Sequence, residues 1–234
     1  MAIVCGVDGC RAGWVAVCFD PFQGRFSCRI LTSFRELSQL TPLPDVIGVD
    51  IPIGLTESGP RECDRVARQL LGPGRGSSVF PAPLRPILEA RTYDEACRTR
   101  ARIEGKRISL QTWGIIPKIR EVDAALRADP VLGSRVREVH PEVCFFHMAG
   151  MKPMRHSKKT KPGHEERRYL LTEAFGPDVE ELTTSVPRAQ CGRDDVIDAL
   201  AALWTARRIS LGQERTLPTS PCHDRLGQVM EIVV

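Results

Sequence analysis

The stretch Ala2-Ile3-Val4-Cys5-Gly6-Val7-Asp8-Gly9 decides how the fold of this 234-residue chain begins. Its apolar and β-branched residues up to Val7 predict a strand, which the pair Asp8-Gly9 ends. Two more strand patterns follow at Trp14–Phe19 and Arg25–Leu31, with turn residues between them. Three strands joined by short turns predict an antiparallel β-meander.

After this meander, strands alternate with helices. Val46–Asp50 is an apolar run that ends at an aspartate, as is typical of a central parallel strand. Further strands are expected at Val136–Val139 and Val229–Val234. Helical spacing is found at Phe34–Leu40, Glu62–Leu71, Tyr93–Gly105, Lys118–Ala128, Pro141–Met148, Glu165–Phe175 and Asp194–Ser210. These patterns predict an α/β fold with a mixed five-stranded sheet, the meander plus parallel strands, and helices on both faces.

Residues 1–234 are expected to form one domain, because neither an internal repeat nor a linker divides the chain. The Gly/Pro/Ser-rich stretch Gly72–Pro86 is predicted to be a loop or lid. A basic loop insertion is expected at about residues 150–164. Between Met151 and His164 this segment has five lysines or arginines and no carboxylate, which is typical of a mobile loop.

Composition narrows the class of protein. The formal net charge of +4 is too small to make the whole molecule a polyanion binder. Nine cysteines without a repeated spacing argue against a disulfide framework and a zinc ribbon, so most are expected to be buried thiols. The chain shows no signal-peptide pattern and no run of about 18 apolar residues, so we expect a soluble, cytoplasmic protein without membrane contact.

Four aspartates form the leading candidate site. Asp8 and Asp50 each stand where an apolar strand ends, and ligands bind at such strand ends in open α/β sheets. Asp195 and Asp198 are three residues apart and therefore share one face of a helix. Carboxylates are the ligands that Mg²⁺ and Mn²⁺ prefer. If the two strands are neighbours, the four aspartates can hold two ions about 4 Å apart for metal-assisted hydrolysis.

Each of these aspartates also has an ordinary structural explanation. A lone aspartate at a strand end is often a turn former, and either Asp194 or Asp195 could be a helix N-cap. Asp198 lies in the apolar run Ile197–Trp204, where a charge needs a cation or a metal. Arg11 or Arg61 could serve as that cation.

Three polar residues surround the end of the strand at 136–139. Glu138, His140 and Glu142 could supply a further metal ligand or a proton-transfer group, although a solvated strand exit explains them equally well. Candidate phosphate-binding residues are more dispersed, and the basic loop contributes the largest group. They are Arg11, Ser77, Ser78, Lys118, Lys158, Lys159 and Lys161.

Several segments together resemble a known family. They are Gly6–Val15, Asp50–Leu55, Arg61–Asp64, Ser77–Phe80, Pro117–Asp123, Glu138–Glu142 and Asp194–Ala201. They resemble the family called domain of unknown function 429 (DUF429), described as predicted RNase H-like nucleases. Asp195–Ala201 is also similar to the last acidic helix of RuvC-type Holliday-junction resolvases. The resemblance implies an RNase H-like fold in which Asp8, Asp50, Asp195 and Asp198 are the metal ligands.

The leading functional hypothesis is a Mg²⁺- or Mn²⁺-dependent nuclease that hydrolyses DNA or RNA phosphodiesters. One alternative is an ATP-dependent phosphotransferase or ATPase of actin-like fold, because such proteins also place Asp-Gly after the first strand. Those proteins usually repeat the domain, whereas this chain has no second half. A second alternative is a non-catalytic nucleic-acid-binding module. Resolvase-like action would require two active sites and hence a homodimer.

Overall fold

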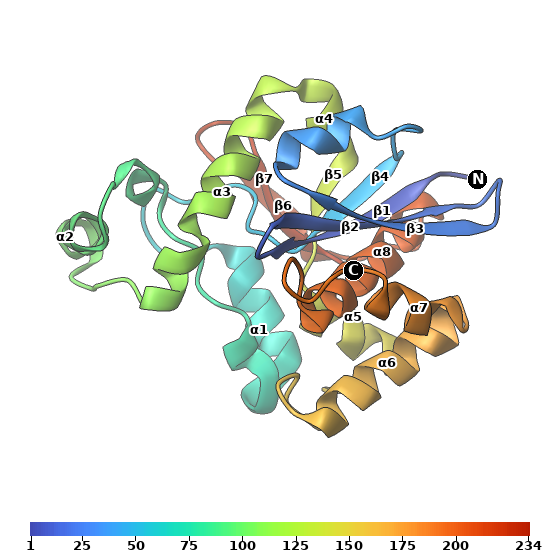
Figure 1. The fold of residues 1–234 in the computed structure, drawn as a ribbon. Coiled ribbons are helices and arrows are strands. Elements are labelled where there is room, and N and C mark those ends of the chain that lie inside the picture. Colours follow the sequence, from blue (N-terminus) through green and yellow to red (C-terminus); the bar gives the residue numbers. More distant parts are fainter.

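A five-stranded mixed sheet forms the centre of the protein in the computed structural model, which describes residues 1–234 (Figure 1). Its strand order is β3-β2-β1-β4-β5. The antiparallel meander consists of β1 (Val4–Cys10), β2 (Gly13–Asp20) and β3 (Arg25–Leu31). The strands β4 (Val46–Val49) and β5 (Val136–Glu138) continue the sheet in parallel with β1. The predicted α/β class and five-stranded sheet are confirmed.

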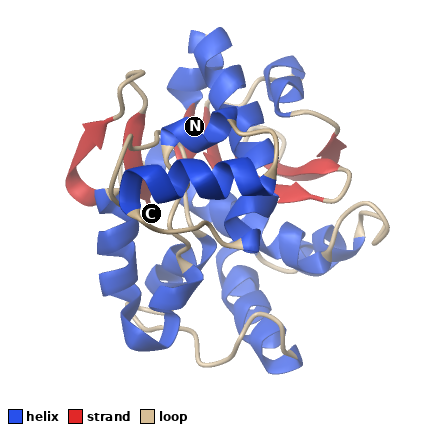
Figure 2. Cartoon of the chain, turned by 90° about the vertical axis from the view of Figure 1, so that its left-hand side faces the viewer, coloured by secondary structure: helices blue, strands red, loops and turns tan.

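Helices cover both faces of this sheet (Figure 2). On one face, α8 (Arg193–Ser210) packs its run of buried alanines and leucines against Val4, Val15 and Val17. The approach is close at Gly6, where a Cβ atom would lie 2.0 Å from the carbonyl oxygen of Ala199. On the opposite face, α3 (Leu110–Ala128) buries one apolar side against Val7 and its neighbours. Each face of the sheet thus has its own hydrophobic core.

The remaining helices surround this two-layered core. They are η1 (Phe34–Gln39), α1 (Glu62–Arg75), η2 (Gly76–Ser78), η3 (Arg85–Glu89), α2 (Tyr93–Glu104), α4 (Pro130–Arg135), α5 (Pro141–Met148), α6 (Lys161–Phe175) and α7 (Asp178–Thr184). Two short helices, α4 and α7, were not predicted, because one or two turns give little periodic signal. Moreover, α3 begins eight residues before the predicted start at Lys118, with Pro117 inside it.

A second sheet of two strands lies beside the main one. The predicted strand near the C-terminus is β7 (Val229–Val233), and it pairs with β6 (Thr216–His223). Sequence reasoning missed β6, which contains Pro218 and Pro221, and prolines cannot donate ladder hydrogen bonds. One parallel bridge, from Val139 to Val233, connects β7 to the end of β5. The chain's last strand thus lies next to the predicted site.

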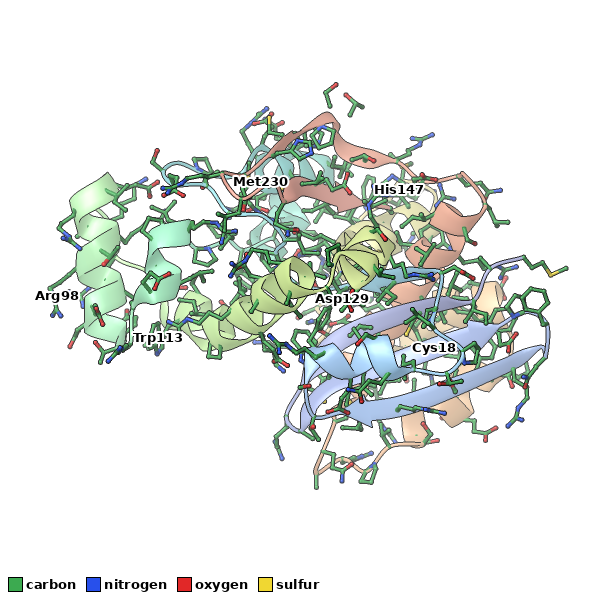
Figure 3. All side chains as sticks on the ribbon, turned by 90° about the horizontal axis from the view of Figure 1, so that it is seen from above. Cys18, Arg98, Trp113, Asp129, His147 and Met230 are labelled. Atoms are coloured by element: carbon green, nitrogen blue, oxygen red, sulfur yellow. The ribbon has the colours of Figure 1, made fainter.

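An arm built on α2 extends from the main body. The segment from η3 to the start of α3 has a small core of its own around Ile87, Cys97 and Ile116. In Figures 1 and 3 this arm lies at the opposite end of the molecule from β3, and Figure 3 labels Arg98 and Trp113 in it. The arm ends beside the cavity described below, because the first half of α3 lines that cavity.

Most cysteines are buried thiols, as expected, and the tryptophans belong to or pack against the core. All nine cysteines are free thiols and six are buried. Trp14 is fully buried, while Trp113 and Trp204 are half-buried and pack against core clusters. None of the helices is both long enough and apolar enough to cross a membrane.

Candidate metal centre

Asp8, Asp50 and Asp198 come together at one edge of the sheet. Val7 of β1 pairs in parallel with Val49 of β4, so the next residue on each strand is an aspartate at the same level. Helix α8 crosses β1 and brings Asp198 to this edge from the second turn of the helix. One oxygen atom from each carboxylate lies within 4.8 Å of the other two. The adjacency inferred for the two strands is confirmed.

Burial and mutual repulsion disfavour three negative charges at this place. Burial raises the pKa of Asp50 and the pKa of Asp198 to about 6. The pKa of Asp8 is raised further, first by burial and then by the charges of Asp50 and Asp198. A group of carboxylates that resists ionisation in this way is typical of a site built to hold a cation.

Lys158 is the cation that pairs with Asp198 in this structure. Its Nζ donates a hydrogen bond to Oδ2 of Asp198 at 2.6 Å. Although burial favours the neutral amine, the charge of Asp198 raises the pKa of Lys158. The suggestion that Arg11 or Arg61 pairs with Asp198 is therefore corrected. The partner comes from the basic loop, across 40 positions of sequence.

Asp195 lies on the same helix but outside this group of three. Its Oδ2 accepts a hydrogen bond from the backbone N–H of Gly192 at 2.9 Å, as the acidic residue of an N-terminal cap does. Asp194 is 3.2 Å from Nε2 of His164 and is partly exposed. The structure thus brings Asp198 into the cluster and leaves Asp195 at the start of the helix, where its charge still raises the pKa of Asp8 after burial, Asp50 and Asp198.

Glu138 is engaged by a buried arginine. Arg61, which is only 2% exposed, donates to both carboxylate oxygens of Glu138 at 2.7 Å and to Asp64 at 2.5 Å. Oε2 of Glu138 also accepts the backbone N–H of Ile53 at 2.6 Å. Burial raises the pKa of Glu138 to about 7, and Arg61 acts against this shift. These contacts connect β5 to the segment after Asp50, so Glu138 helps to hold that segment in place.

Glu142 and His140 each leave a buried polar atom without a partner. Arg167 donates to Oε1 of Glu142, whereas Oε2 of Glu142 has no hydrogen bond. Nε2 of His140 is 3.4 Å from the carbonyl oxygen of Ser78, and its Nδ1 has no partner. A buried polar atom without a hydrogen-bond partner calls for an explanation such as a bound ion or a catalytic role. The three clustered aspartates fit a divalent cation that takes oxygen ligands, and Glu142 is near enough for its charge to raise the pKa of Asp50.

A cavity of about 610 Å³ opens above the carboxylates of Asp8 and Asp50. Its floor is the sheet edge that carries Asp8 and Asp50, and its lining includes Glu138, His140 and Glu142. Of the predicted phosphate-binding residues, five lie in the lining. They are Ser77, Ser78, Lys118, Lys158 and Lys159.

The other two predicted phosphate-binding residues lie elsewhere. Arg11 is exposed outside the cavity lining. Lys161 is the first residue of α6 and is 3.8 Å from Glu165, so the predicted loop ends before it. What remains of the loop is anchored, because Glu166 accepts the backbone N–H groups of Arg155 and His156.

Arg75, Phe80 and Gln111 are lining residues with functional groups that were not among the predicted site residues. Arg75 donates from Nε to the carbonyl oxygen of Met154 and so connects the glycine-rich stretch to the basic loop. Phe80 and Gln111 line the cavity from two different segments of the chain. The sequence offered a signal for Gln111 once α3 is known to begin at Leu110, because Gln111 and Lys118 then share one helical face.

Comparison with known proteins places the chain in a family. No match was found among curated proteins or among solved structures. The sequence model of a family described as "Protein of unknown function (DUF429)" matches residues 6–223, which include all three clustered aspartates. The chain therefore belongs to the DUF429 family.

Proposed function

We propose that this protein is a divalent-metal-dependent nuclease. The observation that carries the proposal is the set of three carboxylates from β1, the end of β4 and α8, whose oxygens lie within 4.8 Å of one another. The strand order and the position of α8 across β1 support the RNase H-like comparison suggested by the sequence. Asp8, Asp50 and Asp198 would hold Mg²⁺ or Mn²⁺. Glu142, whose Oε2 has no hydrogen-bond partner, lines the same cavity as Asp8 and Asp50.

The surrounding residues suit phosphodiester hydrolysis. A bound divalent ion would supply Lewis-acid stabilisation of the charge that develops on the phosphoryl group. Lys118 and Lys159 line the cavity and can orient a phosphate. Burial lowers the pKa of His140, so its ring is neutral near pH 7. If Nε2 donates to Ser78, the unpartnered Nδ1 is free to accept the proton of a water that attacks phosphorus.

Nucleic acid is the proposed substrate because the chain has two basic segments, and one of them lines the cavity with Lys158 and Lys159. Residues 91–107 on the arm contain six lysines or arginines and three carboxylates. Residues 151–168 contain seven lysines or arginines and two carboxylates. Since the whole chain has a net charge of only +4, the remaining residues are net acidic. Two basic segments in a chain that also has an acidic centre suit a polyanionic strand as the substrate.

A cleavage screen tests the proposal directly. Linear, nicked, branched and hybrid DNA and RNA substrates are incubated with the protein and MgCl₂ or MnCl₂, with EDTA as the control. We expect strand cleavage that needs the metal ion. Equal cleavage in EDTA, or no cleavage of any substrate with either ion, would contradict the proposed activity.

Metal binding should stabilise the fold in a pH-dependent way. In the metal-free protein, the raised pKa values of Asp50 and Asp198 mean that the folded state binds more protons than the unfolded state between about pH 4 and 6. Stability from these groups is therefore present at low pH and lost as the pH rises through about 6. Mn²⁺ replaces those protons, and at 100 times its Kd it adds about 2.7 kcal/mol.

Thermal melts measure this effect. We expect Mn²⁺ to raise Tm by about 5–10 °C at about pH 7.5 and by much less at about pH 5. The Asp8→Asn, Asp198→Asn double variant should lose the response. An equal Tm shift at both pH values, or in the double variant, would show that Mn²⁺ binds elsewhere.

Nucleic-acid binding should depend on both basic segments. Arg102 and Lys159 are exposed and have no ion-pair partner, so the Arg102→Glu, Lys159→Glu variant should fold normally. We expect it to bind single-stranded DNA about tenfold more weakly in EDTA, with a salt dependence reduced by about two units of slope. Fluorescence anisotropy measures both quantities. Arg35→Glu on η1, away from the cavity lining, is the matched control and should bind as the wild type does.

A further inference from the structure

The cavity above the carboxylates continues well beyond the space that a metal ion and one phosphate need. At about 610 Å³ it has the volume of a pocket for a small molecule. The sheet edge forms its floor, and α3, the stretch from Gly74 to Phe80, and Ser157–Lys159 form its walls. An intact duplex has no access to carboxylates at the bottom of such a walled pocket unless a nucleotide leaves the base stack.

One face of α3 lines the cavity from its inner end to its outer end. Gln111, Gly114, Ile115 and Lys118 are all lining residues, and their spacing puts them on a single helical face. Lys118 marks the inner end, because its side chain packs on Gly9, next to Asp8, and donates to the carbonyl oxygen of Gly13 at 2.5 Å. Gln111 is seven residues earlier and therefore about 10 Å farther out along the helix.

The outer part of the cavity has the chemistry of a base-binding site. Phe80, which is 42% exposed, lines the cavity, and Ile115 lines it from α3. Gln111 adds an amide that can both donate and accept hydrogen bonds. At Gly114 an added Cβ would meet no atom within 4 Å, so the helix surface there is open to the cavity. An aromatic ring, an aliphatic wall and an amide are groups that proteins use to stack and hydrogen-bond an unpaired base.

We infer that this cavity binds one unpaired nucleotide of a single strand, with its phosphodiester at the three aspartates and its base between Phe80 and Ile115. The inference rests on the proposed nuclease function for the phosphodiester end alone. The base end is a binding site whose occupancy can be measured without cleavage. The substrate class that follows is single-stranded nucleic acid or an unpaired end, and an intact duplex is excluded.

Calorimetric titration in MgCl₂ tests the base site with adenosine 5′-monophosphate and ribose 5-phosphate as probes. Because the two probes share the sugar phosphate, only the base distinguishes them. We expect the wild-type protein to bind the nucleotide at least about tenfold more tightly. Gly114→Leu fills the open surface with a side chain that also suits a helix, so α3 remains folded. This variant should bind both probes equally.

Controls separate this inference from the proposed activity. Leu110→Ala changes an exposed residue of α3 that is not in the cavity lining, and it should keep the nucleotide preference. A single-stranded oligonucleotide should displace the nucleotide, whereas a blunt duplex of the same sequence should not. Equal binding of both probes by the wild type, an unchanged preference in Gly114→Leu, or displacement by the duplex would overturn the inference. A clear nucleotide preference without cleavage of any substrate would instead overturn the nuclease function and leave the base site standing.

Discussion

Asp8→Asn is expected to lower metal-dependent phosphodiester cleavage by about 10³-fold or more, which is about 4 kcal/mol at about 1.36 kcal/mol per factor of ten. The asparagine keeps the oxygen that accepts the backbone N–H of Gly9 at 2.7 Å, so the local backbone is preserved. It removes a charge that burial and two neighbouring aspartates disfavour, as the raised pKa of Asp8 shows. Activity should therefore fall while Tm in metal-free buffer stays the same or rises.

Asp194→Asn is the matched control for this experiment. Asp194 lies on the same helix as Asp198 but pairs with His164 and is partly exposed. Initial cleavage rates in MnCl₂ and melts in EDTA should be measured for both variants and the wild type. Cleavage by Asp8→Asn at more than a tenth of the wild-type rate, with Asp194→Asn unchanged, would remove Asp8 from the metal centre.

The sequence carried enough information to locate the three clustered aspartates. Asp8 and Asp50 could be found because each ends an apolar strand, and parallel neighbouring strands bring such ends together. Asp198 could be found because a charge inside an apolar helix needs a partner. Asp195 could not be assigned in the same way, since an acidic residue at a helix start is also a common cap, and capping is the contact it makes.

The partners of these residues could not be predicted. Lys158 contacts Asp198 from 40 positions away, and Arg61 contacts Glu138 from 77 positions away. Periodicity describes one element at a time and contains no information on which charged side chain meets which. The face of α3 that lines the proposed base site was missed for a related reason. Gln111 and Lys118 share a helical face only if the helix begins at Leu110. Pro117 argued against a helix that begins so early, because proline disfavours the interior of a helix.

Arg61→Met is expected to reduce the free energy of unfolding by about 3–5 kcal/mol. Arg61 lies between Glu138 and Asp64, and all three are buried. Methionine has a similar length but no charge, so two carboxylates would lose their cation in the protein interior. The carbonyl oxygen of Ile53 would also lose its donor at 3.0 Å. Urea denaturation followed by circular dichroism measures the change.

Arg65→Met tests whether burial causes this loss. Arg65 lies in the first turn of α1, which begins just after Arg61, and it pairs with Glu62 at the same three-residue spacing, but both side chains are about half exposed. Exposed ion pairs contribute little, so this variant should unfold at the urea concentration of the wild type. A second test adds Glu138→Gln to Arg61→Met, because removing the unpaired charge should restore part of the stability. Equal effects of the two methionine variants would contradict a role for the buried charges.

Substitution of Arg61 should also weaken metal binding, because Arg61 and Glu138 hold the chain just after Asp50. Glu138 accepts the N–H of Ile53, and Arg61 donates to the carbonyl oxygen of the same residue. Both contacts lie three residues from a proposed ligand. We therefore expect Arg61→Lys, which keeps the charge but loses the two-pronged contact, to remain folded and to bind Mn²⁺ about tenfold more weakly. If Arg61→Lys is folded and its Kd for Mn²⁺ is unchanged, the cluster stabilises the fold without positioning Asp50.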